Sequence, residues 1–441
     1  MYDLGIENGA VYLDGQFSRL NIYIKDSKIA SLTTENCNAS KIIDAKDKFV
    51  LPGFIDPHVH FNLGVGANVS ADDFYTGSVE AAMGGVTTFI DFLDPVKKAA
   101  DIQKEFAKRN ELAQKSIVDY SFHTTIANPS DFAEEIFDDG FKVGINSVKL
   151  FTTYADTDRR TYDDYIFSLL KCSEKAGGIV LVHAENDDLI NHSKEISVKD
   201  HEKSRPSICE NVEIMKLAQM ARVAEGKLYI VHVSAGSSIE LLKTAFRKEL
   251  DNHQIILESC PHYFILNSDC LSRGDGYLYT MTPPLRPETD RILLNQNLDA
   301  ITTIGTDHCP YTVDQKNHQF TSQIPMGIGG IRYSFLNMFS LFGFRILDKF
   351  TKGPAQVYGL TQKGTLAPGK DADVTIFDVN KTTCVKDAAS VYKEKVFNGF
   401  IDSVICGGRL CVSNGVLCVD IGKGKYISRG KLNEGHQRIC S

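Results

Sequence analysis

Short apolar runs that end in polar residues recur along the middle of the chain. We count eight such runs, namely Phe54 to His58, Thr87 to Phe92, Tyr120 to Ile126, Ser147 to Phe151, Ile179 to His183, Leu228 to Val233, Ile255 to Cys260 and Ile301 to Thr306. The stretches between them are long enough for helices, and three carry apolar residues at helical spacing: Asp72 to Met83, Tyr162 to Ala176 and Glu210 to Ala224. Strands that alternate with helices form parallel sheets. Eight in series therefore predict an α/β fold built on a (β/α)8 TIM barrel.

The two ends of the chain carry alternating or β-rich stretches with turn signals between them. These stretches are Ala10 to Leu13, Leu20 to Ile24, Ala372 to Asp378, Ser403 to Cys406 and Gly415 to Asp420. Either end alone has too few strands to bury a core, so we expect one smaller β-sandwich domain built from both termini. The predicted order is sandwich at 1–51, barrel at 52–362, sandwich again at 363–420, and a polar tail at 421–441. The tail is either disordered or an oligomerisation arm.

Composition and charge narrow the classes of function. The 441 residues are 43% hydrophobic and 24% charged, which is typical of a globular protein. The net charge of −8 has both signs interspersed, so no basic surface is expected to bind nucleic acid. No apolar run approaches the ~18 residues that span a bilayer, and the first residues lack a signal-peptide pattern. The 11 cysteines form no C-x-x-C pair and are typical of reduced thiols, which predicts a cytoplasmic protein.

Four histidines and one aspartate stand where the predicted strands end. His58 and His60 are two residues apart at the end of the first strand, so the period of a strand places both imidazoles on one side. His183 ends the fifth strand, His232 ends the sixth and Asp307 follows the eighth. Barrel enzymes keep their chemistry at this end of the strands. Four imidazoles and a carboxylate in this pattern predict a metal site, with zinc as the favoured ion.

Lys149, at the end of the fourth predicted strand, allows two interpretations. As an ammonium it would be repelled by a nearby metal and would reach back to solvent. A partly desolvated lysine instead has a lowered pKa and can react with CO2 to form a carbamate, an anion able to bridge two cations. Two Zn²⁺ ions with one carbamate, one aspartate and one bridging hydroxide carry a net charge of about +1, which favours a developing oxyanion. The carbamate interpretation suits the pattern better.

Several further motifs, together with these residues, resemble the cyclic amidohydrolases and most closely the dihydropyrimidinase/hydantoinase family. The motifs are Leu51-Pro52-Gly53-Phe54-Ile55-Asp56, Ser70-Ala71-Asp72-Asp73-Phe74, Gly84-Gly85-Val86-Thr87-Thr88, Pro283-Pro284-Leu285-Arg286, Thr306-Asp307-His308-Cys309-Pro310 and Gly364-Thr365-Leu366-Ala367-Pro368-Gly369-Lys370-Asp371-Ala372-Asp373. The resemblance therefore runs nearly from end to end. It implies a TIM barrel with two zinc ions, a β-sandwich from both termini and a homotetramer. The implied ligands are His58, His60 and Asp307 for one zinc, His183 and His232 for the other, and N6-carboxylysine at Lys149 as the bridge.

The resemblance also implies an activity, the hydrolysis of a cyclic amide bond in a dihydropyrimidine or a 5-substituted hydantoin. A metal-bridging hydroxide attacks the ring carbonyl, and the ring opens to an N-carbamoyl amino acid. Asp307 accepts the hydroxide proton and passes it to the leaving nitrogen, while Tyr154 donates a hydrogen bond to the oxyanion. Without the resemblance, Tyr154 would be taken for an ordinary loop aromatic. Main-chain substrate contacts are implied at Thr282, where the family usually has serine, and Met326, where asparagine is usual, which leaves the ring substituent open.

Two alternative functions stay open. One is an allantoinase or a dihydroorotase. Dihydroorotases carry an arginine two residues after the His-x-His motif that pairs with the substrate carboxylate, and Asn62 stands there in this chain, which disfavours that substrate. Allantoinases can carry asparagine at that position, but Tyr154 and the Asp72-Asp73-Phe74 segment favour hydantoinase. The other alternative is a non-catalytic, dihydropyrimidinase-related scaffold protein, and the six intact ligand positions argue against it.

The remaining histidines are predicted to lie outside the metal site. His123 stands at the end of the third predicted strand, His262 after the seventh and His308 beside Asp307, where they could line the site, but none has a partner at ligand spacing. Five more stand among polar residues and are expected at the surface, namely His192, His201, His253, His318 and His436.

Overall fold

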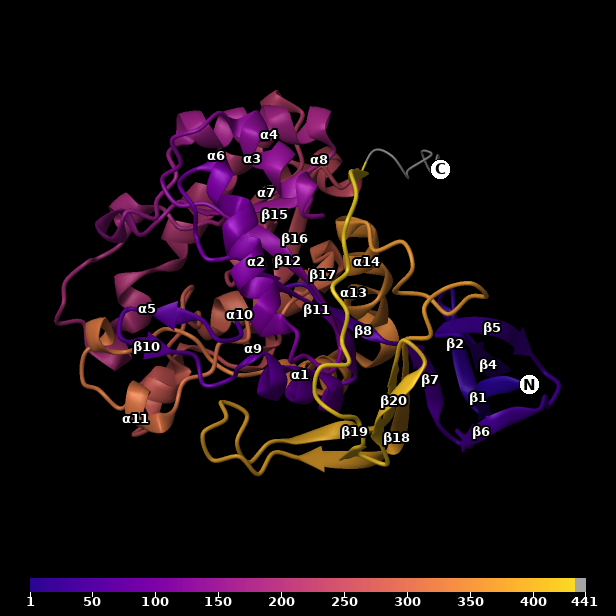
Figure 1. Ribbon diagram of the computed structural model, residues 1–441. Helices are drawn as coiled ribbons and strands as arrows, with labels where there is room; N and C mark the ends of the chain where they lie inside the picture. Colours follow the sequence, from indigo (N-terminus) through magenta and orange to yellow (C-terminus); the bar gives the residue numbers. More distant parts are fainter. Residues whose placement is uncertain (433–441) are drawn as a thin grey trace.

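Eight parallel strands form the central sheet of the computed structural model, which describes residues 1–432 (Figure 1). They are β8 (Phe54–Asp56), β11 (Val86–Phe92), β12 (Asp119–Thr125), β13 (Ser147–Phe151), β14 (Ile179–His183), β15 (Leu228–Ile230), β16 (Ile255–Ser259) and β17 (Thr303–Ile304). The strands pair in chain order from β8 to β17. Just beyond their ends, Val59 and His308 form a parallel bridge that brings the first and last strands together. The predicted barrel is therefore confirmed, with one strand in each of the eight runs.

Helices α1 to α10 lie in the connections between the barrel strands, and α11 to α14 follow β17 (Figure 1). Their bounds are α1 (Phe74–Met83), α2 (Ile102–Ala113), α3 (Ala133–Lys142), α4 (Asp163–Ala176), α5 (His201–Ser204), α6 (Ser207–Ala224), α7 (Gly236–Ala245), α8 (Arg247–Asp251), α9 (Pro261–Ile265), α10 (Glu288–Gln296), α11 (Val313–Lys316), α12 (Ser334–Phe342), α13 (Leu347–Phe350) and α14 (Lys352–Tyr358). The start of α1 is set by Asp73, whose side chain accepts hydrogen bonds from the Tyr75 and Thr76 amides. Within residues 1–432, no helix has the length and apolar character needed to cross a membrane.

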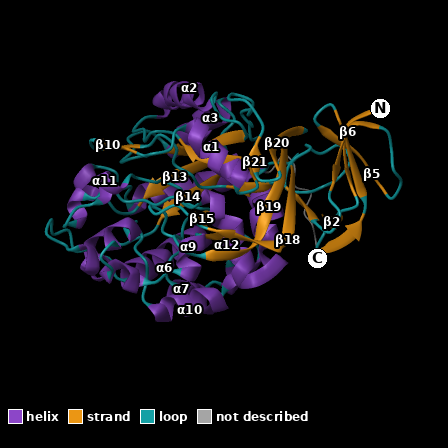
Figure 2. Cartoon of the chain, turned by 90° about the horizontal axis from the view of Figure 1, so that it is seen from below, coloured by secondary structure: helices purple, strands orange, loops and turns teal. Residues whose placement is uncertain are grey.

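Strands from both ends of the chain form a separate β-module beside the barrel (Figure 2). The N-terminal strands are β1 (Tyr2–Glu7), β2 (Ala10–Leu13), β3 (Gln16–Arg19), β4 (Asn21–Lys25), β5 (Lys28–Thr33), β6 (Ala39–Asp44) and β7 (Phe49–Pro52), and the C-terminal ones are β18 (Val374–Cys384), β19 (Val396–Cys406), β20 (Arg409–Ser413) and β21 (Val416–Leu417). One sheet has the order β5-β4-β1-β6 and the other β21-β20-β19-β18-β7-β2-β3. The antiparallel pairing of β7 with β18 joins the two ends, as predicted.

A common core explains why neither end forms this module alone. Ile6, Ile24 and Val50 from the first part are buried in one cluster with Val374 and Ile405 from the second part. Removing either part would expose the apolar side chains of the other to water. The predicted domain limits at residues 51/52 and 362/363 stay predictions.

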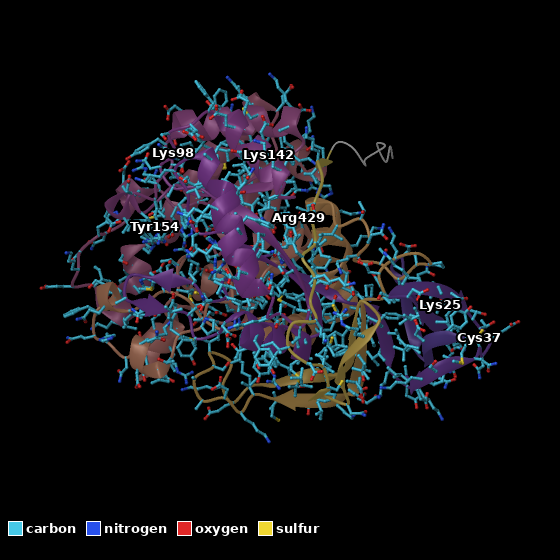
Figure 3. The ribbon with its side chains drawn as sticks, viewed as in Figure 1. Lys25, Cys37, Lys98, Lys142, Tyr154 and Arg429 are labelled. Carbon is cyan, nitrogen blue, oxygen red and sulfur yellow. The ribbon has the colours of Figure 1, made fainter. Side chains whose placement is uncertain are left out.

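The described part of the predicted tail, residues 421–432, runs along the barrel of its own chain. The Tyr120 amide donates to the Lys425 carbonyl at 2.9 Å, and the Arg429 amide donates to the Gly144 carbonyl at 2.7 Å. The Arg429 side chain is buried, and its Nε donates to the Ser121 hydroxyl at 3.0 Å. Figure 3 shows Arg429 on the barrel, far from Lys25 and Cys37 of the β-module. Residues 433–441 lie outside the described residues, and the oligomerisation arm stays a prediction.

Candidate metal centre

The first three predicted ligands, His58, His60 and Asp307, come together at the ends of β8 and β17. Nε2 of His58 lies 3.2 Å from Oδ1 of Asp307, and Nε2 of His60 lies 3.0 Å from the same oxygen. All three ligand atoms lie within 4.8 Å of one another. Asp307 has a φ of 51°, a left-handed conformation that is uncommon outside glycine and often marks functional sites. The three residues form a candidate metal site, which we call the first ligand group.

Glu258 on β16 orients His58 from behind. Its Oε1 lies 2.7 Å from Nδ1 of His58, and both side chains are buried. A carboxylate at this nitrogen keeps the proton on Nδ1 and leaves Nε2 free to bind a metal. That Nε2 is buried and, although the Asp307 oxygen lies 3.2 Å away, it makes no well-aligned hydrogen bond among residues 1–432, which is costly unless another group binds it. The donor set and this unpaired nitrogen therefore fit a metal ion.

Glu258 was missed by the sequence analysis. It lies in the run Ile255 to Cys260, and its acidic side chain in an otherwise apolar strand was the signal that could have revealed it. It also accepts hydrogen bonds from the Tyr229 hydroxyl at 2.7 Å and the His232 amide at 3.0 Å. One buried carboxylate thus contacts two of the predicted ligand residues.

The other predicted ligands are His183, His232 and Lys149, which we call the second ligand group. The rings of His183 and His232 are 4.6 Å apart between centroids. Nε2 of His183 is paired at 2.7 Å with Glu185, a second carboxylate that the sequence analysis missed, so Nδ1 of His183 stays available. Nδ1 of His232 is buried without a hydrogen-bond partner in the described chain. This group also offers free ring nitrogens.

Arg205 keeps Glu185 ionised. Its guanidinium makes two hydrogen bonds to the Glu185 carboxylate, at 3.1 and 2.7 Å. Burial alone would raise the pKa of Glu185, but the charges and hydrogen bonds of Arg205 and His183 together outweigh it and hold that pKa well below its ordinary value. The carboxylate therefore remains an acceptor for the His183 imidazole.

Lys149 is buried in the middle of β13, and not at its end as predicted, with only 2% of its surface exposed. Its Nζ lies 5.6 Å from the ring centroid of Phe92 and 5.2 Å from that of Phe151. The interpretation that Lys149 reaches back to solvent is therefore wrong. Burial lowers the pKa of the Lys149 amine to about 8, which makes the neutral, CO2-reactive form accessible near neutral pH.

Tyr154 and Thr282, which lie far apart in the sequence, meet beside the second ligand group. The Tyr154 hydroxyl donates to Oγ1 of Thr282 at 3.0 Å, and its ring lies 5.4 Å from that of His183. Burial raises the pKa of Tyr154, so its hydroxyl stays protonated and able to donate a hydrogen bond. Figure 3 shows Tyr154 on the barrel.

The loops that carry Thr282 and Met326 are held together by Lys316. Its buried Nζ donates to the Thr280 carbonyl at 2.7 Å and to the Gly327 carbonyl at 2.6 Å. Met326 itself is partly buried on its loop. Its contact with substrate stays a prediction.

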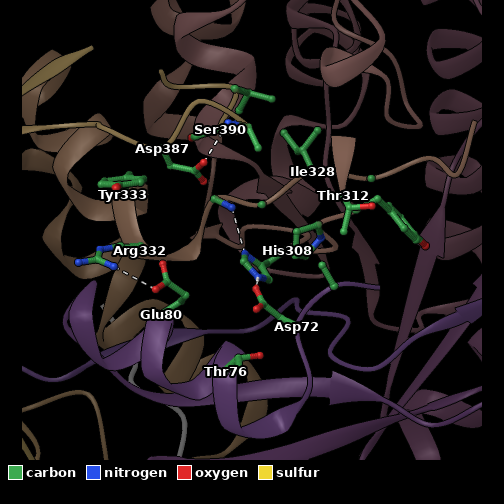
Figure 4. Close-up of a pocket in the computed structure, with 18 of the residues that line it drawn as sticks. Asp72, Thr76, Glu80, His308, Thr312, Ile328, Arg332, Tyr333, Asp387 and Ser390 are labelled. Carbon is green, nitrogen blue, oxygen red and sulfur yellow. Dashed lines mark hydrogen bonds and ion pairs between the residues drawn. The ribbon is translucent and has the colours of Figure 1, made fainter. Parts of the chain in front are cut away.

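His308 lines a cavity of about 680 Å³ whose lining includes none of the predicted metal ligands (Figure 4). Its Nε2 pairs with Asp72 at 2.9 Å, and its Nδ1 accepts hydrogen bonds from the amides of Gly330 and Ile331. Both ring nitrogens of His308 are therefore engaged in hydrogen bonds. The prediction that His308 lies outside the metal site agrees with this geometry.

His201 was predicted at the surface, and that prediction is wrong. The side chain is buried, and its Nε2 lies 2.9 Å from the Met281 carbonyl, directly before Thr282. Helix α5 has only four residues, too few for a pattern of polar and apolar positions to show which side faces the barrel. His192, His253 and His318 are exposed as predicted, and His436 lies outside the described residues.

Known proteins are similar to this chain over almost its whole length. The sequence profile of the amidohydrolase family matches residues 49–411. The D-phenylhydantoinase of Escherichia coli O1:K1 is 30% identical, with 96% of this chain and 97% of that protein covered. The D-hydantoinase of Ralstonia pickettii is 30% identical, with 98% and 100% covered. The crystal structure of dihydropyrimidinase from Brevibacillus agri has a TM-score of 0.90 at 26% identity, with 98% and 99% covered.

Proposed function

This chain belongs to the amidohydrolase family and is a hydantoinase-like hydrolase, and we propose that its substrate is a dihydropyrimidine or a 5-substituted hydantoin. Hydrolysis of one ring amide bond opens such a ring to an N-carbamoyl amino acid. The observation that carries the proposal is the convergence of His58, His60 and Asp307 within 4.8 Å at the strand ends of a barrel. The names of the relatives support this substrate class.

We assign two zinc ions to the site, one held by each ligand group. His58, His60 and Asp307 would hold the first, His183 and His232 would hold the second, and carboxylated Lys149 would be a ligand of both. Formation of the carbamate joins the Lys149 nitrogen to the carbon of CO2 and releases one proton. The metal pair, when bound, supplies a water whose pKa is lowered to about 7 and a Lewis acid for the ring carbonyl.

The side chains around the site then perform the proton transfer and the charge stabilisation. Asp307 accepts the proton of the attacking water and delivers it to the leaving ring nitrogen. The Tyr154 hydroxyl, which pairs with Thr282 in this structure, donates instead to the carbonyl oxygen as that oxygen gains negative charge. Main-chain groups at Thr282 and Met326 hold the ring.

A turnover panel on metal-replete protein tests the substrate class. It contains dihydrouracil, 5-substituted hydantoins, allantoin and dihydroorotate, with ring opening followed for each compound. The proposal expects the highest kcat/KM on dihydrouracil or a hydantoin. A preference for allantoin or dihydroorotate would move the function to another cyclic amidohydrolase, and no turnover with two bound zinc ions would favour the scaffold alternative.

Metal analysis tests the cofactor assignment separately. Protein purified without chelator should contain about two equivalents of zinc per chain, one for each ligand group. Full activity with a metal content near zero would contradict the assignment.

We further propose a homotetramer in the cytoplasm. The ten cysteines in the described part of the chain are all free, as expected in a reducing compartment. Light scattering should give four times the chain mass of 48.9 kDa. A mass of one or two chains would overturn the tetramer, and cell fractionation tests the location.

A further inference from the structure

Asp187 lies on the loop after β14, and its carboxylate contacts Thr153 and Tyr154 on the loop after β13. Oδ1 of Asp187 accepts a hydrogen bond from the Thr153 hydroxyl at 2.7 Å and from the Tyr154 amide at 3.0 Å. The Asp187 and Thr153 side chains are buried. Asp187 begins a short 3-10 helix, Asp187–Leu189, four residues after His183. The loop of a predicted metal ligand is thereby joined to the loop of Tyr154.

The backbone of Tyr154 needs such a partner. Its φ of 68° and ψ of 41° lie in the left-handed region, which costs free energy for any residue with a side chain and persists only where the surroundings enforce it. The Tyr154 carbonyl accepts hydrogen bonds from the amides of Thr157 and Arg159, which belong to the same loop. The Tyr154 amide donates only to Asp187 within the described part of the chain.

We infer that Asp187 is a positioning residue for Tyr154, holding its left-handed backbone so that the phenol hydroxyl points at the reacting carbonyl. The inference rests on the proposed function of Tyr154 as the hydrogen-bond donor to the oxyanion. A displacement of about 1 Å at such a donor can cost about 100-fold in rate, so its backbone anchor matters to catalysis.

The position of the Asp187 oxygen matters more than its charge. Nη1 of Arg160 lies 3.7 Å from Oδ2, longer than a hydrogen bond. His192 Nε2 lies 3.6 Å from Oδ1. An amide oxygen at the same place accepts the same two hydrogen bonds as the carboxylate. Asparagine should therefore replace Asp187, whereas a longer carboxylate should not.

Four variants test the inference. Asp187→Ala removes the acceptor, and Asp187→Glu keeps the charge but moves it by one methylene. Both should lower kcat by about 10- to 100-fold, with a smaller change in KM and an unchanged zinc content. Asp187→Asn should keep kcat within about threefold of the unaltered protein, because it retains the acceptor. The matched control is Asp188→Ala, since Asp188 is exposed and contacts Arg160 at 3.4 Å but touches neither Thr153 nor Tyr154.

A double-mutant cycle separates positioning from general destabilisation. In a Tyr154→Phe background the hydroxyl is absent, so adding Asp187→Ala should lower kcat by less than about threefold further. Additive losses, or near-normal kcat in Asp187→Ala, would overturn the inference. If Asp187→Ala does not fold, the comparison of Asp187→Asn with Asp187→Glu decides the question alone. Near-normal kcat in Tyr154→Phe itself would instead refute the proposed role of Tyr154.

Discussion

The two ligand groups differ in the charges that hold them together. In the first group the Asp307 carboxylate lies 3.2 and 3.0 Å from the imidazoles of His58 and His60, so an anion already stands among the ligands. The second group has two imidazoles, His183 and His232, and the buried amine of Lys149. It contains no anion of its own. Under the proposed function, positive metal charge would be compensated in the first group by an ordinary side chain, and in the second only by carboxylated Lys149.

The two groups share one feature: a buried carboxylate contacts one ring nitrogen of a histidine and leaves the other ring nitrogen available. Glu258 stands behind His58 at 2.7 Å, and Glu185 stands behind His183 at 2.7 Å. Arg205 neutralises Glu185, whereas within the described residues no lysine or arginine forms an ion pair with Glu258. Orientation of the imidazoles is therefore built into both groups, while an anionic side chain is present in only one.

The largest effect on activity is expected from a substitution of Asp307, the anionic residue of the first ligand group. Asp307→Asn removes a metal ligand and the proton acceptor together, so kcat/KM should fall by about 10,000-fold. Steady-state kinetics on the best substrate and metal analysis measure the change. Asp314→Asn, an exposed aspartate at the start of α11, serves as the control. Loss of less than tenfold would remove Asp307 from the mechanism.

The next largest loss of activity is expected from a substitution of Lys149 in the second ligand group. Lys149→Ala removes the source of its anion, so we expect about a 1,000-fold loss of activity and a zinc content near one equivalent. Small carboxylic acids added with zinc should restore part of the rate, because they supply the missing anion. The exposed Lys171→Ala on α4 is the control. Failure of every acid to restore any rate in a folded variant would contradict the carbamate.

Tyr154 differs from the residues of both ligand groups, because it lies beside the second group but is not a predicted metal ligand. Tyr154→Phe deletes only the hydroxyl and should lower kcat by about 100- to 1,000-fold, since one oxyanion donor is lost. Zinc content should stay the same, and KM should change less than kcat. A variant with normal kcat on the best ring substrate would show that Tyr154 takes no part in the reaction.

The smallest effect should come from the carboxylates behind the histidines. Glu258→Gln should weaken zinc binding at the first group by about 10- to 100-fold and at the second group by less, because Glu258 contacts His58 through its ring but His232 only through its main-chain amide. Glu185→Gln should weaken zinc binding mainly at the second group. Competition with a zinc-binding dye resolves the two affinities. Equal weakening of both ions by either variant would mean that the groups do not bind metal independently.

The eight barrel strands could be predicted from the sequence because their apolar runs are short, buried and bounded by polar residues. The runs Ser147 to Phe151 and Ile179 to His183 coincide with β13 and β14. Once the strands are parallel, their ends meet at one edge, so His58 and Asp307 could be placed together although 249 residues separate them. Local pattern plus topology was sufficient there.

Only the tertiary structure decided which groups surround those ligands. Glu258 contacts His58 across 200 positions of sequence, and Asp187 contacts Thr153 across 34. His201 looked exposed among polar neighbours and is buried against a loop 80 residues away. A carboxylate or imidazole has the same local pattern whether it faces water or a distant partner. Its role is determined by the segment that folding brings within hydrogen-bond distance, and no local periodicity encodes that segment.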